Sequence, residues 1–323
     1  MAETAIEPEI EIVDAHHHLW DHETPYGRYD LDELRADTGA GHNVVETVFI
    51  DCGSNYLTTG PESMRPVGET LFVTARADTS DRTPGAHISA IVSHVNLGLG
   101  QGAGDVLDAH IEAAGGRFRG IRHSGAISGT SEVVSSRGEP PADLYRRPAF
   151  QAGARELAAR RLTFDAWQYH HQLGEVVALA RAVPDLRIIV NHLGGPIGIG
   201  SWARRWDEVH ADLRRHLGEL AACENVWLKV GGIGMSRFGT GWDRTVEDPS
   251  SDTIVDMWDN TVRFAIDTFG PSRCMFESNY PVDGQTVGYV ELWNAFKKMS
   301  ARYTPDERSD LFAGTARRAY HIG

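Results

Sequence analysis

Short apolar runs alternate with longer stretches of helical periodicity along most of the chain. The runs are rich in Val and Ile, as strands buried on both faces of a parallel sheet are. Eight of them are predicted as strands: Ile10–Ala15, Val44–Asp51, Ile88–Val95, Phe118–His123, Leu162–Trp167, Leu186–Asn191, Val226–Val230 and Arg273–Glu277.

Helical patterns fall between most of these strands. In one of them, Leu173, Val176, Val177 and Ala180 recur at helical spacing before Pro184 ends the pattern. The clearest helices are predicted over Asp105–Ala114, Pro148–Arg160, Leu173–Val183, Trp202–Ala222 and Thr253–Phe269, and the early helices are weakly marked.

This alternation predicts an α/β fold, specifically a (β/α)8 TIM barrel formed by residues 1–323 as a single domain. No G-x-G-x-x-G follows a strand, so a dinucleotide-binding sheet is the weaker choice. Three Pro/Gly-rich stretches, Thr58–Gly68, Ser124–Pro141 and Gly231–Ser251, follow predicted strands. In a barrel such βα loops line the active site, although each stretch could also be a plain surface loop.

Composition and charge narrow the class of partner. The formal net charge is −14, which disfavours nucleic acid and anionic membranes. The three cysteines form no C-x-x-C pair, so neither a disulfide framework nor a cysteine zinc site is indicated. The acidic N-terminus lacks the apolar core of a signal peptide, and no run reaches the length of a membrane helix. We expect a cytoplasmic enzyme with a small-molecule substrate; a homodimer is one candidate for its oligomeric state.

Histidines stand at the ends of several predicted strands. By alternation, Asp14, His16 and His18 share one face of the first strand and His17 points the other way. Two imidazoles on one face can hold a metal ion or polarise a carbonyl, and a solvated His-rich turn is the alternative. His192 ends the sixth strand in the same manner and is a candidate for the same site.

Other polar residues at strand ends are candidates for substrate contacts. His170, after the fifth strand, is favoured slightly over its neighbour His171, and either could instead be a surface residue. Arg122 at the fourth strand end could anchor a carboxylate or form a structural salt bridge. We expect Trp167 and Tyr280 to line the apolar side of the pocket.

These pieces resemble the amidohydrolase superfamily, in particular its lactonase-like and decarboxylase-like branch, amidohydrolase family 2. The resemblance covers nearly the whole chain and rests on Val13–His18, Gly120–His123, Asp165 with Gln172-Leu173, Asn191–Pro196 and Met275–Pro281. It implies a (β/α)8 barrel with His16 and His18 as the first-strand pair and His192 as the sixth-strand histidine. It also implies one divalent metal ion on these three histidines, with zinc favoured over manganese. Some lactonase members work without metal, and that mechanism stays open.

The sequence departs from the family at the eighth strand. The usual motif is close to Gly-Ser-Asp-Trp-Pro, whose Asp is the general base, whereas this chain has Glu277-Ser-Asn-Tyr-Pro281. The amide of Asn279 cannot take a proton from water at neutral pH. Glu277 lies two residues earlier, on the same strand face, and could supply the carboxylate, or it could pair structurally with a lysine such as Lys229. Asp14, His170 and Asp283 are the other candidate bases.

The leading hypothesis is therefore hydrolysis of a lactone or related cyclic ester or amide of a small acidic substrate. The catalytic candidates are His16, His18, His192, Glu277 and Asn279, and the candidates for substrate contacts are Arg122, Trp167, His170 and Tyr280. A lyase that decarboxylates, or cleaves a carbon–carbon bond of, an aromatic or β-keto acid is the second hypothesis. The third is a barrel that binds a small molecule without turnover.

Overall fold

A computed structural model describes residues 3–133, 138–245 and 247–323. Eight parallel strands follow one another in chain order, β1 to β8, in one sheet. They are β1 (Glu11–His17), β2 (Asn43–Ile50), β3 (His87–Ser93), β4 (Phe118–Arg122), β5 (Thr163–Ala166), β6 (Ile188–Val190), β7 (Val226–Val230) and β8 (Cys274–Phe276). Every predicted strand is confirmed to within a few residues, and so is the (β/α)8 barrel.

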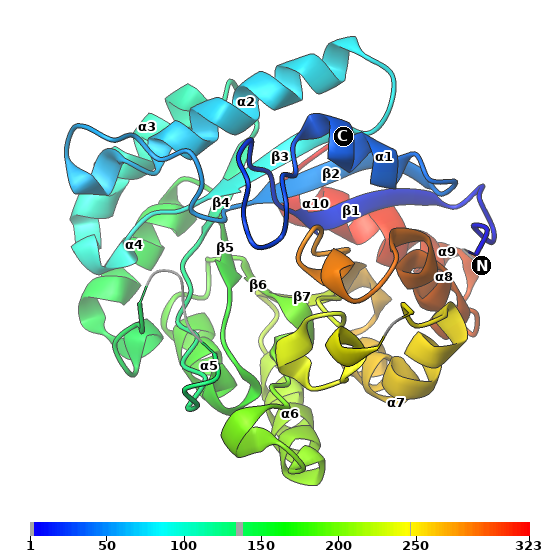
Figure 1. Cartoon of the computed structure of the whole chain (residues 1–323). Helices are drawn as coiled ribbons and strands as arrows, with labels where there is room; N and C mark the ends of the chain where they lie inside the picture. Colours follow the sequence, from blue (N-terminus) through cyan, green and yellow to red (C-terminus); the bar gives the residue numbers. More distant parts are fainter. Residues whose placement is uncertain (1–2, 134–137, 246) are drawn as a thin grey trace.

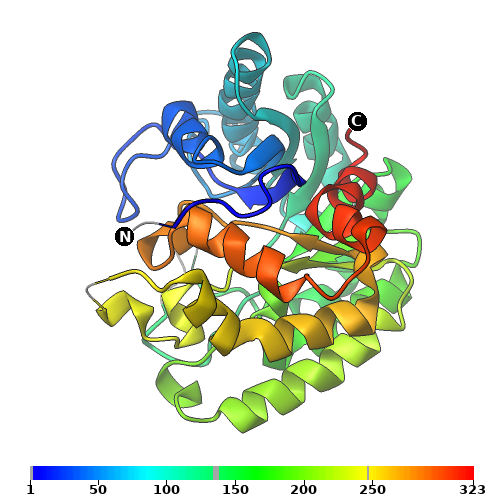
Figure 2. The same cartoon turned by 90° about the vertical axis from the view of Figure 1, so that its right-hand side faces the viewer.

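The sheet curls into a barrel whose ends meet just beyond β8. The backbone N–H of Asn279 donates to the carbonyl of His16 at 2.9 Å, and that of His18 donates to the carbonyl of Tyr280 at 2.8 Å. Figure 1 shows the helices as a ring outside the strands, and Figure 2 shows α6 and α7 side by side on one flank. The helices are α1 (Leu31–Thr38), α2 (Val67–Arg82), α3 (Ala103–Ala113), α4 (Pro148–Ala159), α5 (Leu173–Ala182), α6 (Trp206–Ala221), α7 (Ser251–Phe269), α8 (Tyr289–Met299), α9 (Pro305–Ser309) and α10 (Thr315–Tyr320).

Two apolar clusters fill this architecture. The larger joins the outer faces of the strands to the helices, as Ile12, Ile88 and Leu217 illustrate. The smaller joins inward strand residues such as Val13 to α10, whose Tyr320 belongs to the same cluster. The C-terminal helix therefore packs against the barrel interior.

Several predicted boundaries differ from the observed ones, two of them in ways that have a clear physical reason. The stretch Thr58–Gly68 is not all loop, because α2 begins at Val67. The predicted helix over Trp202–Ala222 begins only at Trp206, because Ala203 is extended and Arg204 has a φ of 62°. No helix in the described part of the chain combines the length and the apolar run that crossing a bilayer requires.

Candidate active site

Three histidines from two strand ends converge at the carboxyl end of the barrel. His16 lies in β1, His18 directly follows it and His192 follows β6, and their side chains are almost fully buried. The Nε2 atoms of His16 and His18 lie 3.3 Å apart, and the ring centroids of His16 and His192 lie 4.5 Å apart. The structure thus brings together the three histidines that the sequence singled out.

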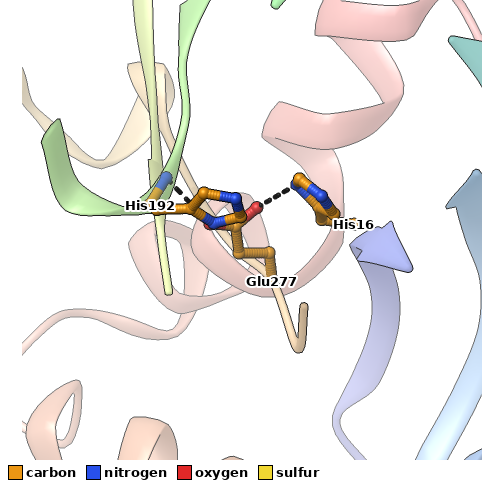
Figure 3. A group of neighbouring side chains, drawn as sticks. All are labelled: His16, His192 and Glu277. Atoms are coloured by element: carbon orange, nitrogen blue, oxygen red, sulfur yellow. Dashed lines mark hydrogen bonds and ion pairs between the residues drawn. The ribbon is translucent and has the colours of Figure 1, made fainter. Parts of the chain in front are cut away.

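Glu277 lies between two of these imidazoles (Figure 3). Its Oε1 accepts hydrogen bonds from the backbone N–H of His192 at 3.0 Å and from the ring Nδ1 of the same residue at 2.8 Å. Its Oε2 lies 2.8 Å from Nδ1 of His16, within ion-pair distance but without the angle of a good hydrogen bond. One fully buried carboxylate therefore bridges the first and sixth strands.

The expected face-sharing of Asp14 with His16 and His18 was wrong. The pairing of β1 with β2 shifts register between Asp14 and His17, so simple alternation ends there. Asp14 instead accepts hydrogen bonds from the backbone N–H of Ser278 at 2.8 Å and the hydroxyl of Tyr289 at 3.1 Å. The carboxylate thereby ties β1 to α8.

A cavity of about 1520 Å³ opens above the carboxyl ends of the strands, and residues of all three predicted loops line it. Within the described residues, its lining includes Arg122 and Trp167 but none of the three histidines. Nη1 of Arg122 lies 3.4 Å from Nε2 of His16, and the Trp167 ring lies 4.7 Å from that of His192, centroid to centroid. A ligand in the cavity therefore meets these two side chains before it meets the imidazoles.

Arg122 is itself held in place by Asp51 at the end of β2. Nη2 of Arg122 donates to the carbonyl oxygen of Asp51, and Nε lies 3.8 Å from its carboxylate. The guanidinium still lines the cavity with Nη1 directed at His16. The sequence left two roles open for Arg122, a structural salt bridge and a substrate contact. The same side chain can perform both.

The imidazoles are held neutral at pH 7. Burial lowers the pKa of His16 and His18 well below the ordinary value, and the Arg122 guanidinium beside them acts in the same direction. Burial also lowers the pKa of His192, although the Glu277 carboxylate opposes that shift. Neutral imidazoles are the form that binds metal ions and accepts protons.

Asn279 faces away from this group. Its backbone takes a left-handed φ of 56°, and its Nδ2 donates to the carboxylate of Asp283 at 2.6 Å. Asp283 also accepts from the backbone N–H of Gly234 at 2.8 Å, and burial raises the pKa of its carboxyl to about 8. The Asn279 amide therefore forms a hydrogen bond with a buried carboxyl group and does not contact the histidines.

Two candidates for substrate contacts lie outside the main cavity. His170 is buried, with its ring 4.8 Å from that of Trp202, centroid to centroid. Tyr280 donates from its hydroxyl to the carbonyl of Val287 and lines a separate cavity of about 330 Å³. Sequence alternation cannot reveal this, because both residues follow their strands, where the backbone has already turned.

Lys229 in β7 belongs to the same polar interior. Its Nζ lies 2.8 Å from Oδ1 of Asp165 and 3.4 Å from Nδ1 of His16. It therefore pairs with Asp165, whereas Glu277 contacts the histidines. The sequence does show one sign of this role, because Lys229 is a charged residue inside the apolar run Val226–Val230. The contact between Lys229 and His16 cannot be predicted from that run.

The donor set suits a divalent metal ion. One ligand atom from each of His16, His192 and Glu277 lies within 4.8 Å of the others. The 3.3 Å separation of the His16 and His18 Nε2 atoms also fits two imidazole ligands about 2.1 Å from a tetrahedral zinc, which stand about 3.4 Å apart. Imidazole and carboxylate donors suit zinc, and manganese takes them as well.

Comparisons with known proteins identify the family through a family model, and a solved structure shares the fold. The model of the amidohydrolase family matches residues 13–322. An uncharacterised protein of Sinorhizobium fredii is 31% identical, covering 97% of this chain and 99% of its own. The L-fucono-1,5-lactonase of Burkholderia multivorans is 27% identical, covering 96% of each. A crystal structure of a zinc-bound amidohydrolase from Burkholderia multivorans superimposes with a TM-score of 0.74 at 24% identity, covering 97% of this chain and 99% of that one.

Proposed function

The chain belongs to the amidohydrolase family, and from this premise we propose that it hydrolyses a lactone or related cyclic ester or amide of a small acidic substrate. The observation that carries the proposal is the buried Glu277 carboxylate, which contacts both His16 and His192 beside a cavity lined by Arg122. The similarity to an L-fucono-1,5-lactonase supports a lactone as the substrate class.

In this proposal the Glu277–His192 pair activates water. The carboxylate accepts the Nδ1–H of His192 at 2.8 Å, which leaves Nε2 of that ring with its lone pair. Nε2 can then take a proton from water as the water attacks the ring carbonyl, while the carboxylate stabilises the imidazolium that forms. Glu277 supplies the negative charge that Asn279 lacks.

Arg122 serves the substrate in the same scheme. It lines the cavity with Nη1 3.4 Å from His16, so its guanidinium can donate to a substrate carboxylate or to the developing oxyanion. Trp167 covers His192 and supplies an apolar wall for the ring of the substrate.

His16 and His18 would hold a divalent ion through their Nε2 atoms, which lie 3.3 Å apart, and Nε2 of His192 would stay free to take the proton from water. Such an ion, when bound, supplies Lewis-acid polarisation of the carbonyl and lowers the pKa of bound water. The chain's own residues would fix its position: Ile50 holds the ring of His18, and Glu277 contacts the rings of the other two histidines.

The test is a panel of sugar-acid and aromatic lactones assayed by proton release, after chelation and again with zinc or manganese added. We expect at least one lactone to open faster than its spontaneous rate. His16→Ala and His192→Ala should lose most of that rate while the protein stays folded. Near wild-type rates in both variants would refute the assignment of the site.

Asn279 gives a reason to keep decarboxylation as the alternative. Its amide replaces the carboxylate that water activation uses in the family pattern, and Asp283, with a pKa of about 8, is a neutral buried acid beside it. Release of CO2 from aromatic or β-keto acids without lactone opening would favour this reaction.

A further inference from the structure

The main cavity has a second half-buried guanidinium besides that of Arg122. Among the described residues, the arginines that line this cavity are Arg65, Arg122, Arg147 and Arg237. Arg65 and Arg147 are exposed to solvent, whereas Arg122 and Arg237 are half-buried. Arg122 is held by Asp51 beside His16. Arg237, in the loop after β7, is therefore the half-buried arginine of the cavity whose role is still unexplained.

The guanidinium of Arg237 has few partners inside the protein. In the part of the chain that the structure describes, its one side-chain hydrogen bond is a long one, 3.4 Å from Nη1 to the hydroxyl of Tyr169. No carboxylate of that part pairs with it, although the chain has 45 acidic residues. A guanidinium has five N–H donors, so most of those of Arg237 remain available to an anionic ligand in the cavity.

The backbone that carries Arg237 is fixed by its neighbours. Arg237 lies in a short 3-10 turn, Ser236–Phe238, and the side chain of Phe238 is fully buried. The backbone carbonyl of Arg237 accepts the N–H of Gly198 at 3.0 Å. Gly239 packs so closely on Gly198 that a Cβ atom on it would collide with the carbonyl of Gly198. A ligand that reaches Arg237 therefore meets a group on a preorganised backbone.

A wall of two aromatic rings leads from His192 to Arg237. The Trp167 ring lies 4.7 Å from that of His192 and 5.3 Å from that of Tyr169, centroid to centroid. Trp167, Tyr169 and Arg237 all line the cavity, and the Tyr169 hydroxyl contacts Arg237. A substrate ring that packs on Trp167 with its carbonyl towards His192 therefore directs its opposite end towards Arg237.

We propose that Arg237 is a specificity-determining residue that binds a carboxylate at the end of the substrate opposite to the reacting carbonyl. A single guanidinium matches the two oxygens of a carboxylate. Arg122 then serves the end beside His16. The inference rests on the proposed function and deepens it, because it defines the substrate as a lactone with a carboxylate remote from its carbonyl.

A matched pair of lactones tests the preference. The lactone of an aldonic acid ends in a hydroxymethyl group, whereas that of the corresponding aldaric acid ends in a carboxylate, and the rings are the same. The wild type should open the aldaric lactone with the higher kcat/KM. Arg237→Gln should lower that value by about 10- to 100-fold, because a hydrogen bond between charged groups is lost, and should change the value for the aldonic lactone by less than about threefold.

Two further variants serve as controls. Arg237→Lys keeps the charge without the planar fork and should recover part of the preference. Arg244→Gln changes an exposed arginine later in the same loop, which is not among the described residues that line the cavity, and should alter neither rate. Equal losses for both lactones in Arg237→Gln would indicate a structural role for Arg237 and overturn the proposal.

Calorimetric binding of the two open-chain acids tests the same contact without turnover. The wild type should bind the aldarate more tightly than the aldonate, and Arg237→Gln should remove the difference. That result without opening of either lactone would keep Arg237 as an anion-binding residue and count against the proposed hydrolysis. Equal affinity of the wild type for the two acids would overturn the role of Arg237, whether or not the lactones are opened.

Discussion

Glu277 and Asn279 leave the same strand end in different directions. The Glu277 carboxylate receives two N–H groups of His192 and lies against His16, whereas the Asn279 side chain turns to Asp283. At the residue scale, the carboxylate beside the histidines is therefore that of Glu277, two positions before the residue that carries the carboxylate in the usual family motif. Sequence alternation put Glu277 and Asn279 on one face, and the left-handed backbone of Asn279 removes it from that face.

Glu277→Gln should reduce kcat/KM for a lactone by about 100-fold or more, because a neutral amide cannot stabilise the imidazolium of His192. Asn279→Ala should reduce activity much less, because that amide donates its hydrogen bond to Asp283 and not to the histidines. Steady-state kinetics on both purified variants, with thermal unfolding as the check on folding, measures the difference. The reverse order would make Asn279 the substrate or oxyanion contact.

Arg122→Lys should raise KM for an acidic lactone by about 10- to 100-fold, because a hydrogen bond to a charged group is lost. Lysine keeps the charge but not the planar fork that reaches Asp51 and the cavity together. Arg147→Lys, at an exposed guanidinium on the cavity wall bonded to the carbonyl of Ala142, is the matched control. Equal KM values for the two variants would argue against Arg122 as the anchor.

At the scale of single elements, some strands and helices are easier to predict from the sequence than others. The strands were predictable because buried parallel strands read as Val- and Ile-rich runs. Helix α2 was not, because its buried positions include Glu69, Thr70 and Ser80. The Glu69 carboxylate accepts the backbone N–H groups of Cys52 and Ser54, so the helix packs through polar contacts that leave no apolar stripe.

The last helix, α10, makes long-range contacts that the hydrophobic pattern of the sequence cannot predict. Tyr320 lies next to Asp165 although the two are far apart in sequence, because α10 packs against the barrel interior. The convergence of the three histidines follows from strand order and could be predicted. The contacts of Lys229 and the direction of Asp14 depend on packing and on the register shift in β1, which no periodicity encodes.

Tyr320→Phe should lower the free energy of unfolding by about 1–3 kcal/mol, because it leaves the buried Asp165 carboxylate without the hydroxyl that donates to it. Tyr303→Phe removes a hydroxyl bonded to the more exposed Asp267 and should change stability by no more than about 0.5 kcal/mol. Urea unfolding of both variants makes the comparison. Equal losses would mean that the tie from α10 to the barrel interior adds little.

At the scale of the whole molecule, neutral histidines are buried throughout the fold. Burial lowers the pKa of His17, His42, His110 and His170 from 6.5 to about 4. Between these values the unfolded chain binds more protons than the folded chain, so stability falls as the pH drops. Burial of Asp283 raises the pKa of its carboxyl to about 8 and acts in the opposite sense, but the histidines outnumber such acids.

The melting temperature of the chelator-treated protein should therefore fall steadily as the pH drops from 6.5 towards 4. Calorimetry across that range measures it, and at each pH the metal must be absent because bound metal adds its own pH dependence. A melting temperature that stays constant or rises as the pH drops would show that these histidines are not neutral in the folded state.

The most direct test of the central claim is lactone opening in water labelled with ¹⁸O. Suppose that the site formed by His16, His192 and Glu277 directs water onto the ring carbonyl of the lactone. The product acid of the wild type then gains one labelled oxygen in its new carboxylate. The His192→Ala variant should then add label no faster than the spontaneous reaction. A product of the wild type that carries no label, or that has lost CO2, would contradict hydrolysis at this site.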